Sequence, residues 1–223
     1  MLHIIQSDPG VTAGVLAELL DEWRIGYRIV RPDLGESLPA RSVAVIVLGG
    51  EMGVHDEAQH PFLVPLKAFL RQALQVGTPL LGSCLGGQLL ADAAGGTVTA
   101  NRCGEKGLVE IALSATGAAD PLFAGIAAPL RVFHWHNDSF SIPPGAQQLA
   151  SSPTCPGQAF RIGRAWGLQF HPEVDLAIVT RWSRRTPAAA HLPGEFVGYA
   201  AAHRAMARQL LGNFLGMAGI EVC

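Results

Sequence analysis

A short apolar strand that turns sharply into a helix, with a cysteine at the turn, constrains the fold of this chain more than any other segment. The apolar run Pro79–Leu81 predicts a buried strand, Leu85–Ala94 predicts a helix, and Gly82–Gln88 (GSCLGGQ) joins them. Such a turn strains the backbone of its central residue and pushes the side chain out at the carboxyl edge of the sheet, and flanking glycines prevent collisions. The segment therefore predicts an α/β fold with Cys84 at a strand-to-helix corner.

Cys84 has the predicted surroundings of a nucleophile. At a helix N-terminus, the helix dipole and the unpaired N–H groups favour the thiolate over the thiol. The alternative is a small buried cysteine at a tight corner, but suitable partners occur downstream. Trp166–Glu173 (WGLQFHPE) predicts a strand that stops at His171, because Pro172 cannot continue the ladder. His171 there suits a general base and acid, and Glu173 suits the group that holds its tautomer.

A second strand end supplies candidate hydrogen-bond donors. Val43–Leu48 has the pattern of a buried strand and is followed by Gly49 and Gly50. Reactive groups of a parallel α/β sheet gather beyond the carboxyl ends of its strands. We therefore predict that the N–H groups of Gly50 and Leu85 bind a developing oxyanion. A plain glycine turn after a strand is the alternative.

The remaining hydrophobic pattern alternates strands with helices and later changes to hairpin-like strands. This order predicts one domain over residues 1–223. Its predicted fold is a three-layer α/β sandwich, in which helices flank a mostly parallel central sheet that carries a small antiparallel extension. Besides the segments above, the predicted strands are 2–6, 27–30 and short ones around 97–113 and 130–136, and the predicted helices are 11–23, 61–75 and 195–215.

Three motifs follow one another along the chain, namely the strand ending in Gly49-Gly50, Gly82–Gln88 and Gln169–Glu173 (QFHPE). They resemble the motifs of the class I (triad) glutamine amidotransferases. Two further segments, Phe133–Phe140 (FHWHNDSF) and Gln158–Arg161 (QAFR), make the chain similar, more narrowly, to free-standing proteins that resemble the amidotransferase domain of GMP synthase. The similarity extends from about Ile4 to Trp182.

This resemblance implies a flavodoxin-like fold and a hydrolytic reaction. It implies that Cys84 attacks the side-chain amide of glutamine, that His171 acts as base and acid, and that Glu173 orients His171. Ammonia then leaves, and water resolves a γ-glutamyl thioester. We expect no cofactor.

The chain departs from the family pattern at two places. Glu51 follows the glycine pair, where the family usually has proline, and Asn137 replaces the glycine of a His-Gly-Asp sequence. Asparagine tolerates left-handed backbone angles better than most residues, so the loop can keep its shape. Gln88, one turn into the helix, is a candidate contact to bound glutamine, with a helix-surface glutamine as the alternative. The predicted substrate contacts are Gly49, Gln88, Asn137, Asp138 and Ser139.

Composition excludes several other classes of function. A net charge of −2 argues against nucleic acid or an acidic membrane as a partner, and no run reaches the roughly 18 apolar residues of a membrane span. A small basic cluster of Arg181, Arg184 and Arg185 is interpreted as a solvated helix end, with an anion site as the alternative. The other thiols, Cys103, Cys155 and Cys223, indicate a reducing compartment, so we predict a cytoplasmic protein.

We predict no metal site. His134 and His136 lie two residues apart and could be imagined as a metal pair with His171. However, the sequence shows no cysteine or carboxylate at a ligand spacing beside them, and the triad already uses His171. His134 and Trp135 are instead expected to be wall and core residues near the pocket.

What is missing from the sequence shapes the expected function. No phosphate-binding glycine loop is present, and we expect no synthetase domain of its own. The leading hypothesis is a free-standing amidotransferase-like enzyme that hydrolyses glutamine to glutamate and ammonia, with a separate synthetase or ammonia-accepting subunit as a partner. The alternatives are a γ-glutamyl peptidase or hydrolase acting on another γ-linked amide, and a non-catalytic regulatory relative.

Overall fold

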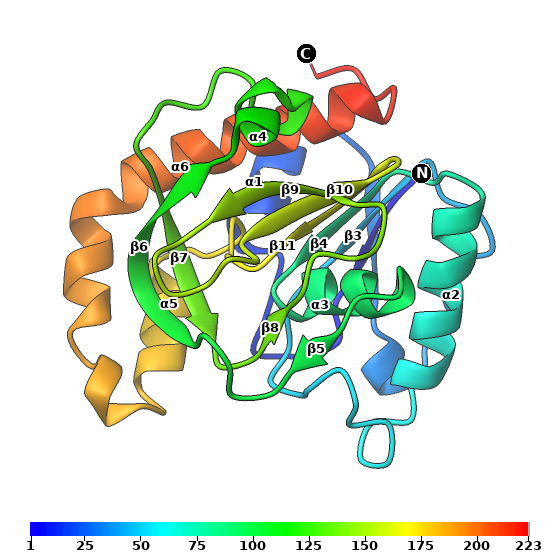
Figure 1. Cartoon of the computed structure of the whole chain (residues 1–223), viewed down its shortest axis with the longest axis horizontal. Helices are drawn as coiled ribbons and strands as arrows, with labels where there is room; N and C mark the ends of the chain where they lie inside the picture. Colours follow the sequence, from blue (N-terminus) through cyan, green and yellow to red (C-terminus); the bar gives the residue numbers. More distant parts are fainter. Residues whose placement is uncertain (223) are drawn as a thin grey trace.

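A nine-stranded sheet runs through the computed structural model, which describes residues 1–222 (Figure 1). Its strands come from both halves of the chain, and the strands that carry the cysteine turn and the histidine segment are neighbours at its centre. In spatial order they are β2 (Tyr27–Val30), β1 (Leu2–Ile5), β3 (Ala44–Val47), β4 (Leu80–Ser83), β11 (Ala165–Leu168), β10 (Ala159–Ile162), β9 (Gln147–Ser151), β6 (Glu105–Leu113) and β7 (Leu130–His136).

The sheet has a parallel half and an antiparallel half. Strands β2, β1, β3, β4 and β11 pair in parallel. From β11 onward, each neighbouring pair through β10, β9, β6 and β7 is antiparallel. The predicted α/β class with a parallel core is confirmed, and the antiparallel extension comprises four strands. The parallel register sets Ser83 beside Leu168, so β4 and β11 end at the same edge.

Helices cover both faces of the sheet. The apolar side chains of α1 (Gly14–Glu22), α5 (Leu176–Ser183) and α6 (Leu192–Met217) form one core with one face. Those of α2 (Leu63–Gln75) and α3 (Leu85–Ala93) form a second core with the other. This arrangement confirms the three layers. Smaller elements are the helix α4 (Ala115–Ala119), the 3-10 turns at 32–34, 121–123 and 187–189, and a two-stranded sheet of β5 (Val98–Thr99) and β8 (Ser139–Phe140).

Two element boundaries differ from the sequence prediction in ways that shape the site. Helix α1 begins at Gly14 rather than Val11, and the N–H of Val15 in its first turn donates to the Glu173 carbonyl (2.9 Å). Strand β11 ends at Leu168, and the His171 N–H then donates to the Phe133 carbonyl in β7 (2.9 Å). The chain therefore leaves the parallel pairing before His171, because the backbone of His171 bonds to β7 instead.

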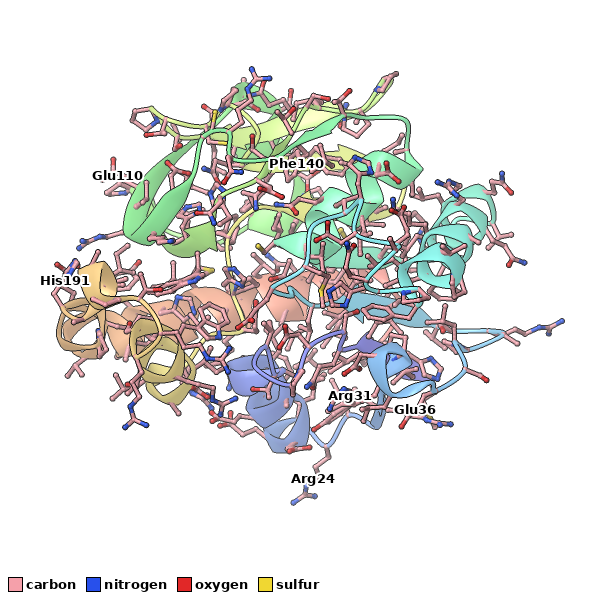
Figure 2. All side chains as sticks on the ribbon, turned by 90° about the horizontal axis from the view of Figure 1, so that it is seen from below. Arg24, Arg31, Glu36, Glu110, Phe140 and His191 are labelled. Atoms are coloured by element: carbon pink, nitrogen blue, oxygen red, sulfur yellow. The ribbon has the colours of Figure 1, made fainter. Side chains whose placement is uncertain are left out.

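Charged and apolar side chains are segregated between the surface and the interior. Charged groups such as Arg24 and Glu110 project from the periphery, whereas Phe140 is buried (Figure 2). Within residues 1–222, no helix combines the length and the apolar character that a membrane crossing needs.

Candidate active site

Cys84 occupies the strained turn between β4 and α3. Its backbone has φ 51° and ψ −110°, a region that non-glycine residues rarely adopt. The helix can reach this position because its first turn contains two glycines. A Cβ atom on Gly86 would lie 2.0 Å from the Val47 carbonyl oxygen, and one on Gly87 would lie 2.3 Å from the Leu168 carbonyl oxygen. Glycine at both positions lets the first turn of α3 pack directly on two strand backbones. Such strain persists only where the surrounding structure enforces it, which is typical of functional sites.

His171 and Glu173 form a buried pair beside the cysteine. The His171 Nδ1–H donates to Glu173 Oε1 (2.7 Å), and both side chains are buried. A Cβ atom on Gly49 would lie 3.1 Å from His171 Cε1 and 3.6 Å from Cys84 Cβ, so Gly49 lies against both residues. Ser83, which the sequence reasoning missed, donates its hydroxyl to Glu173 Oε2 (2.7 Å). The glutamate therefore has a donor on each oxygen.

The charges of this cluster control the protonation of His171. Burial by itself lowers the pKa of an imidazole. The negative charge of Glu173 and the interaction with Cys84 outweigh burial and raise the pKa of His171 to about 10. The structure therefore favours an imidazolium next to the Cys84 sulfur.

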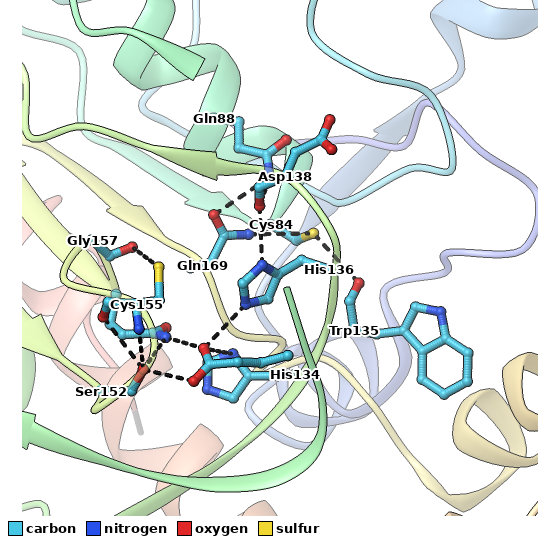
Figure 3. Close-up of polar contacts among 12 residues, drawn as sticks. Cys84, Gln88, His134, Trp135, His136, Asp138, Ser152, Cys155, Gly157 and Gln169 are labelled. Atoms are coloured by element: carbon cyan, nitrogen blue, oxygen red, sulfur yellow. Dashed lines mark hydrogen bonds and ion pairs between the residues drawn. The ribbon is translucent and has the colours of Figure 1, made fainter. Parts of the chain in front are cut away.

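The Cys84 sulfur has two further polar neighbours (Figure 3). Its Sγ atom lies 3.9 Å from the carbonyl oxygen of Trp135 and 3.8 Å from the side-chain nitrogen of Gln169. The predicted oxyanion donors lie nearby, since a Cβ atom on Gly50 would be 2.8 Å from Leu85 Cδ2. Leu85 is the first residue of α3, where N–H groups lack a partner within the helix.

A cavity of about 370 Å³ opens at Cys84. Three predicted substrate contacts, Gln88, Asn137 and Asp138, line it, whereas Gly49 and Ser139 do not. Ser139 is instead a buried residue of β8. The whole lining consists of Val11, Gly50, Glu51, Met52, Gly53, Cys84, Gln88, Lys106, Trp135, His136, Asn137, Asp138, His171, Trp182, Arg185 and Thr186.

Gln88 supports the loop that carries Asp138. The helix-surface alternative for Gln88 is wrong, because its side chain is buried and its amide donates to the Asp138 carbonyl (3.1 Å). The Asp138 carboxylate accepts the Asn101 N–H (2.9 Å). Both contacts fix the loop at one side of the cavity.

Glu51 also has a structural role that proline could not fill. Its backbone N–H donates to Asp8 Oδ2 (3.1 Å), a bond for which proline has no hydrogen. Its side chain forms an ion pair with Arg185 across the cavity mouth. The interpretation of the basic cluster as a solvated helix end is therefore incomplete, since Arg185 is exposed but also lines the cavity. Nothing in the sequence places residues 51 and 185 together.

The antiparallel half of the sheet brings a second acid–imidazole cluster to the same region. Glu105, His134 and His136 are all buried, and one ligand atom from each lies within 4.8 Å of the others. Burial would raise the pKa of Glu105, but hydrogen bonds from His136 and Ser152 lower it below its usual value. Burial lowers the pKa of His134 to about 3. The expectation that no carboxylate accompanies these histidines was wrong, because the β6–β7 register places Glu105 opposite His136.

The other cysteines are separate from this site. Cys155 is buried, which raises the pKa of its thiol to about 11, and Cys103 is half-buried. Neither lines the cavity, and Cys223 lies outside the described residues.

Comparisons with known proteins agree with this geometry. Residues 16–178 match the family described as glutamine amidotransferase class-I. The chain is 32% identical over 187 residues to the glutamine amidotransferase-like protein YfeJ of Salmonella typhimurium, with 80% of this chain and 77% of that protein covered. It is 37% identical over 147 residues to the glutamine-hydrolysing GMP synthase of Aeropyrum pernix. That match covers 63% of this chain but spans only 26% of the GMP synthase.

The fold is also shared with a solved structure. A glutamine amidotransferase from Thermotoga maritima superimposes with a TM-score of 0.87 at 27% sequence identity. The superposition covers 96% of this chain and 97% of the other.

Proposed function

This chain belongs to the class-I glutamine amidotransferase family, and we propose that it hydrolyses the side-chain amide of glutamine to glutamate and ammonia through a thioester on Cys84. The observation that carries this proposal is the strained cysteine at a helix N-terminus beside a buried imidazole–carboxylate pair. Members of the family are usually enzymes, and the family implies glutamine as a substrate. We do not expect a cofactor to take part.

In the first half of the reaction, the Cys84 thiolate attacks the amide carbon and forms a tetrahedral intermediate. The N–H groups of Gly50 and Leu85 stabilise its oxyanion. His171, held as an imidazolium, gives its proton to the amide nitrogen. The carbon–nitrogen bond then breaks, ammonia leaves, and the γ-glutamyl group remains bound to sulfur as a thioester.

In the second half, water replaces ammonia. The neutral His171 accepts a proton from water as that water attacks the thioester carbon. The carbon–sulfur bond breaks, which releases glutamate and restores the thiolate beside the imidazolium. Glu173 accepts the Nδ1–H bond throughout and so keeps Nε2 available for proton transfer.

Incubation of the purified protein with L-glutamine tests the proposal, with ammonia and glutamate both measured. We expect equal amounts of the two products. Cys84→Ala should abolish their release, and Cys103→Ala, a cysteine outside the cavity, should not. Ammonia release that persists in Cys84→Ala at the wild-type rate would exclude the thioester mechanism.

A γ-glutamyl amide larger than glutamine is a second candidate substrate. The cavity of about 370 Å³ falls within the range of pockets that bury ligands of drug size, and two indole side chains, Trp135 and Trp182, line it. A panel of γ-glutamyl amides tested beside glutamine separates the two candidates. Faster hydrolysis of a γ-glutamyl peptide, with glutamine ignored, would favour the second.

Other parts of the functional hypothesis rest on the sequence. A separate synthetase or ammonia-accepting subunit remains the predicted partner, and the protein is predicted to be cytoplasmic and to form one domain over residues 1–223. A partner that orders the glycine loop at Gly49–Gly53 should accelerate a slow basal glutaminase. A rapid reaction without any partner, at roughly 1 s⁻¹ or faster, would instead indicate a self-sufficient hydrolase.

A further inference from the structure

The cluster of Glu105, His134 and His136 has no role in the reaction proposed above, although its residue types are those of metal sites. His136 Nε2 lies 3.3 Å from Glu105 Oε2, and His134 Nδ1 lies 3.9 Å from the same oxygen. Ligand atoms on a tetrahedral zinc ion lie about 3.3 Å apart when the metal–nitrogen bonds are about 2.0–2.1 Å. Glu105 and His136 have this spacing, and all three ligand atoms lie within 4.8 Å of one another, so a small shift of His134 would bring the set onto one ion.

Neighbouring groups orient two of the three side chains. His136 Nδ1–H donates to the Asp138 carbonyl oxygen (3.0 Å), the type of bond that directs the other ring nitrogen of a histidine toward a metal. Glu105 accepts the Ser152 hydroxyl on Oε1 (2.6 Å) and the Gln158 amide on Oε2. Figure 3 shows the His136 ring between Asp138 above it and the side chains of His134 and Ser152 below it. The cluster is thus held in place without any contribution from the reacting groups.

The hydrogen bonds around this cluster do not account for the buried imidazole of His134. Its side chain is fully buried, and neither ring nitrogen has a hydrogen-bond partner among residues 1–222. A buried polar group without a partner destabilises a fold, and a phenylalanine of similar shape would avoid that cost. A metal ion bound at Nδ1 would give one of these two nitrogens a partner.

We propose that Glu105, His134 and His136 form a site for a divalent transition metal of the zinc class. Two imidazoles and one carboxylate suit Zn²⁺, which takes nitrogen and oxygen ligands and is commonly four-coordinate. The ion would bind His136 through an unprotonated Nε2, so any proton there would pass to solvent when the metal binds. The metal would tie β6 to the end of β7, from which the loop at Asn137 and Asp138 enters the cavity.

Metal titration of the full chain tests this site. The Cys84→Ala protein, which removes the thiol of the active site, is treated with a chelator, dialysed and titrated with Co²⁺ as a spectroscopic substitute for Zn²⁺. We expect one equivalent of Co²⁺ per chain, absorption bands of low-symmetry cobalt, no sulfur-to-cobalt charge transfer, and displacement by Zn²⁺. His134→Phe and the conservative Glu105→Gln should each weaken binding by at least about 100-fold.

His203→Phe is the matched control, because His203 is also a buried histidine without a hydrogen-bond partner at either ring nitrogen among residues 1–222. It should keep one equivalent of metal. Thermal unfolding gives a second readout: Zn²⁺ should raise the Tm of the parent protein but not of His134→Phe. Lack of stoichiometric binding by the parent, or unchanged binding in both cluster variants, would overturn the proposal. Neither readout depends on glutamine hydrolysis.

Discussion

Each half of the sheet holds a buried glutamate in contact with a histidine, and the two pairs differ in what faces the imidazole. In the parallel half, His171 lies between Glu173 and Cys84. In the antiparallel half, His136 lies between Glu105 and the Asp138 carbonyl oxygen, with His134 next to it. The same residue types therefore lie beside the strained Cys84 in one half of the sheet and away from it in the other.

The protonation of the histidines follows these partners. Glu173 and Cys84 raise the pKa of His171 to about 10, although burial of the imidazole acts in the opposite direction. For His134, burial and a second imidazole prevail over the single charge of Glu105, and its pKa falls to about 3. A buried histidine next to a glutamate is thus not sufficient to define a catalytic base. The strained cysteine beside it makes the difference.

Loss of the parallel-half imidazole should have the largest effect. His171→Ala removes the group that protonates the leaving amide nitrogen and later activates water, so kcat should fall by at least about 10³-fold. Ammonia release from L-glutamine measures this. His191→Ala, an exposed histidine on the surface (Figure 2), is the control and should keep wild-type activity. A His171→Ala protein with undiminished kcat would leave the two clusters chemically equivalent.

Glu173→Gln should have a smaller effect on rate and a specific effect on pH dependence. Without the carboxylate charge, burial prevails and the pKa of His171 should fall below about 10. The imidazolium then loses its proton at a lower pH, so kcat/KM should decline at a lower alkaline pH than in the wild type. We expect a loss of about 10²-fold in kcat. NMR titration of His171 measures the shift, and an unchanged titration would show that Glu173 does not set its charge.

Much of the parallel-half site could be predicted from the sequence because its parts are local. The cysteine turn needs glycines next to it, and the histidine and glutamate are two residues apart. Ser83 was not predicted, because its hydroxyl meets Glu173 only through the register that sets β4 beside β11. The fold class followed from the alternation of strands and helices, which is also a local signal.

The antiparallel half could not be predicted in the same way. Glu105 and His136 are 31 residues apart in sequence and meet only through the pairing of β6 with β7. Arg185 reaches the cavity from beyond α5 and meets Glu51, which is 134 residues away. Contacts of this kind depend on register and crossover, and no spacing in the sequence reports them.

Ser83→Ala should have a moderate effect, mainly on stability. It removes one hydrogen bond to the buried Glu173 carboxylate (2.7 Å), and such bonds to charged groups contribute about 1.5–3 kcal/mol. Urea unfolding should show a loss of that size in the free energy of unfolding. The remaining His171–Glu173 bond should hold kcat within about 10-fold of wild type. A loss of activity equal to that of Glu173→Gln would assign Ser83 a larger part in the reaction.

Glu105→Gln should have the smallest effect on catalysis. Its side chain does not line the cavity and acts on it through His136, whose ring contacts the Asp138 carbonyl. One weakened hydrogen bond of about 0.5–1.5 kcal/mol corresponds to a rise in KM of about 2- to 10-fold, with kcat nearly unchanged. Steady-state kinetics with L-glutamine separates the two constants. A large loss of kcat at normal KM would place the antiparallel cluster in the chemistry itself.

Covalent labelling tests most directly whether Cys84 is the nucleophile that distinguishes the two clusters. A diazo-ketone analogue of glutamine is incubated with the protein, and intact-mass measurement with peptide mapping locates the adduct. We predict one label per chain, on Cys84, and none on Cys155, whose burial raises its pKa to about 11. Labelling of Cys103 or Cys155 with Cys84 unmodified would contradict the assignment.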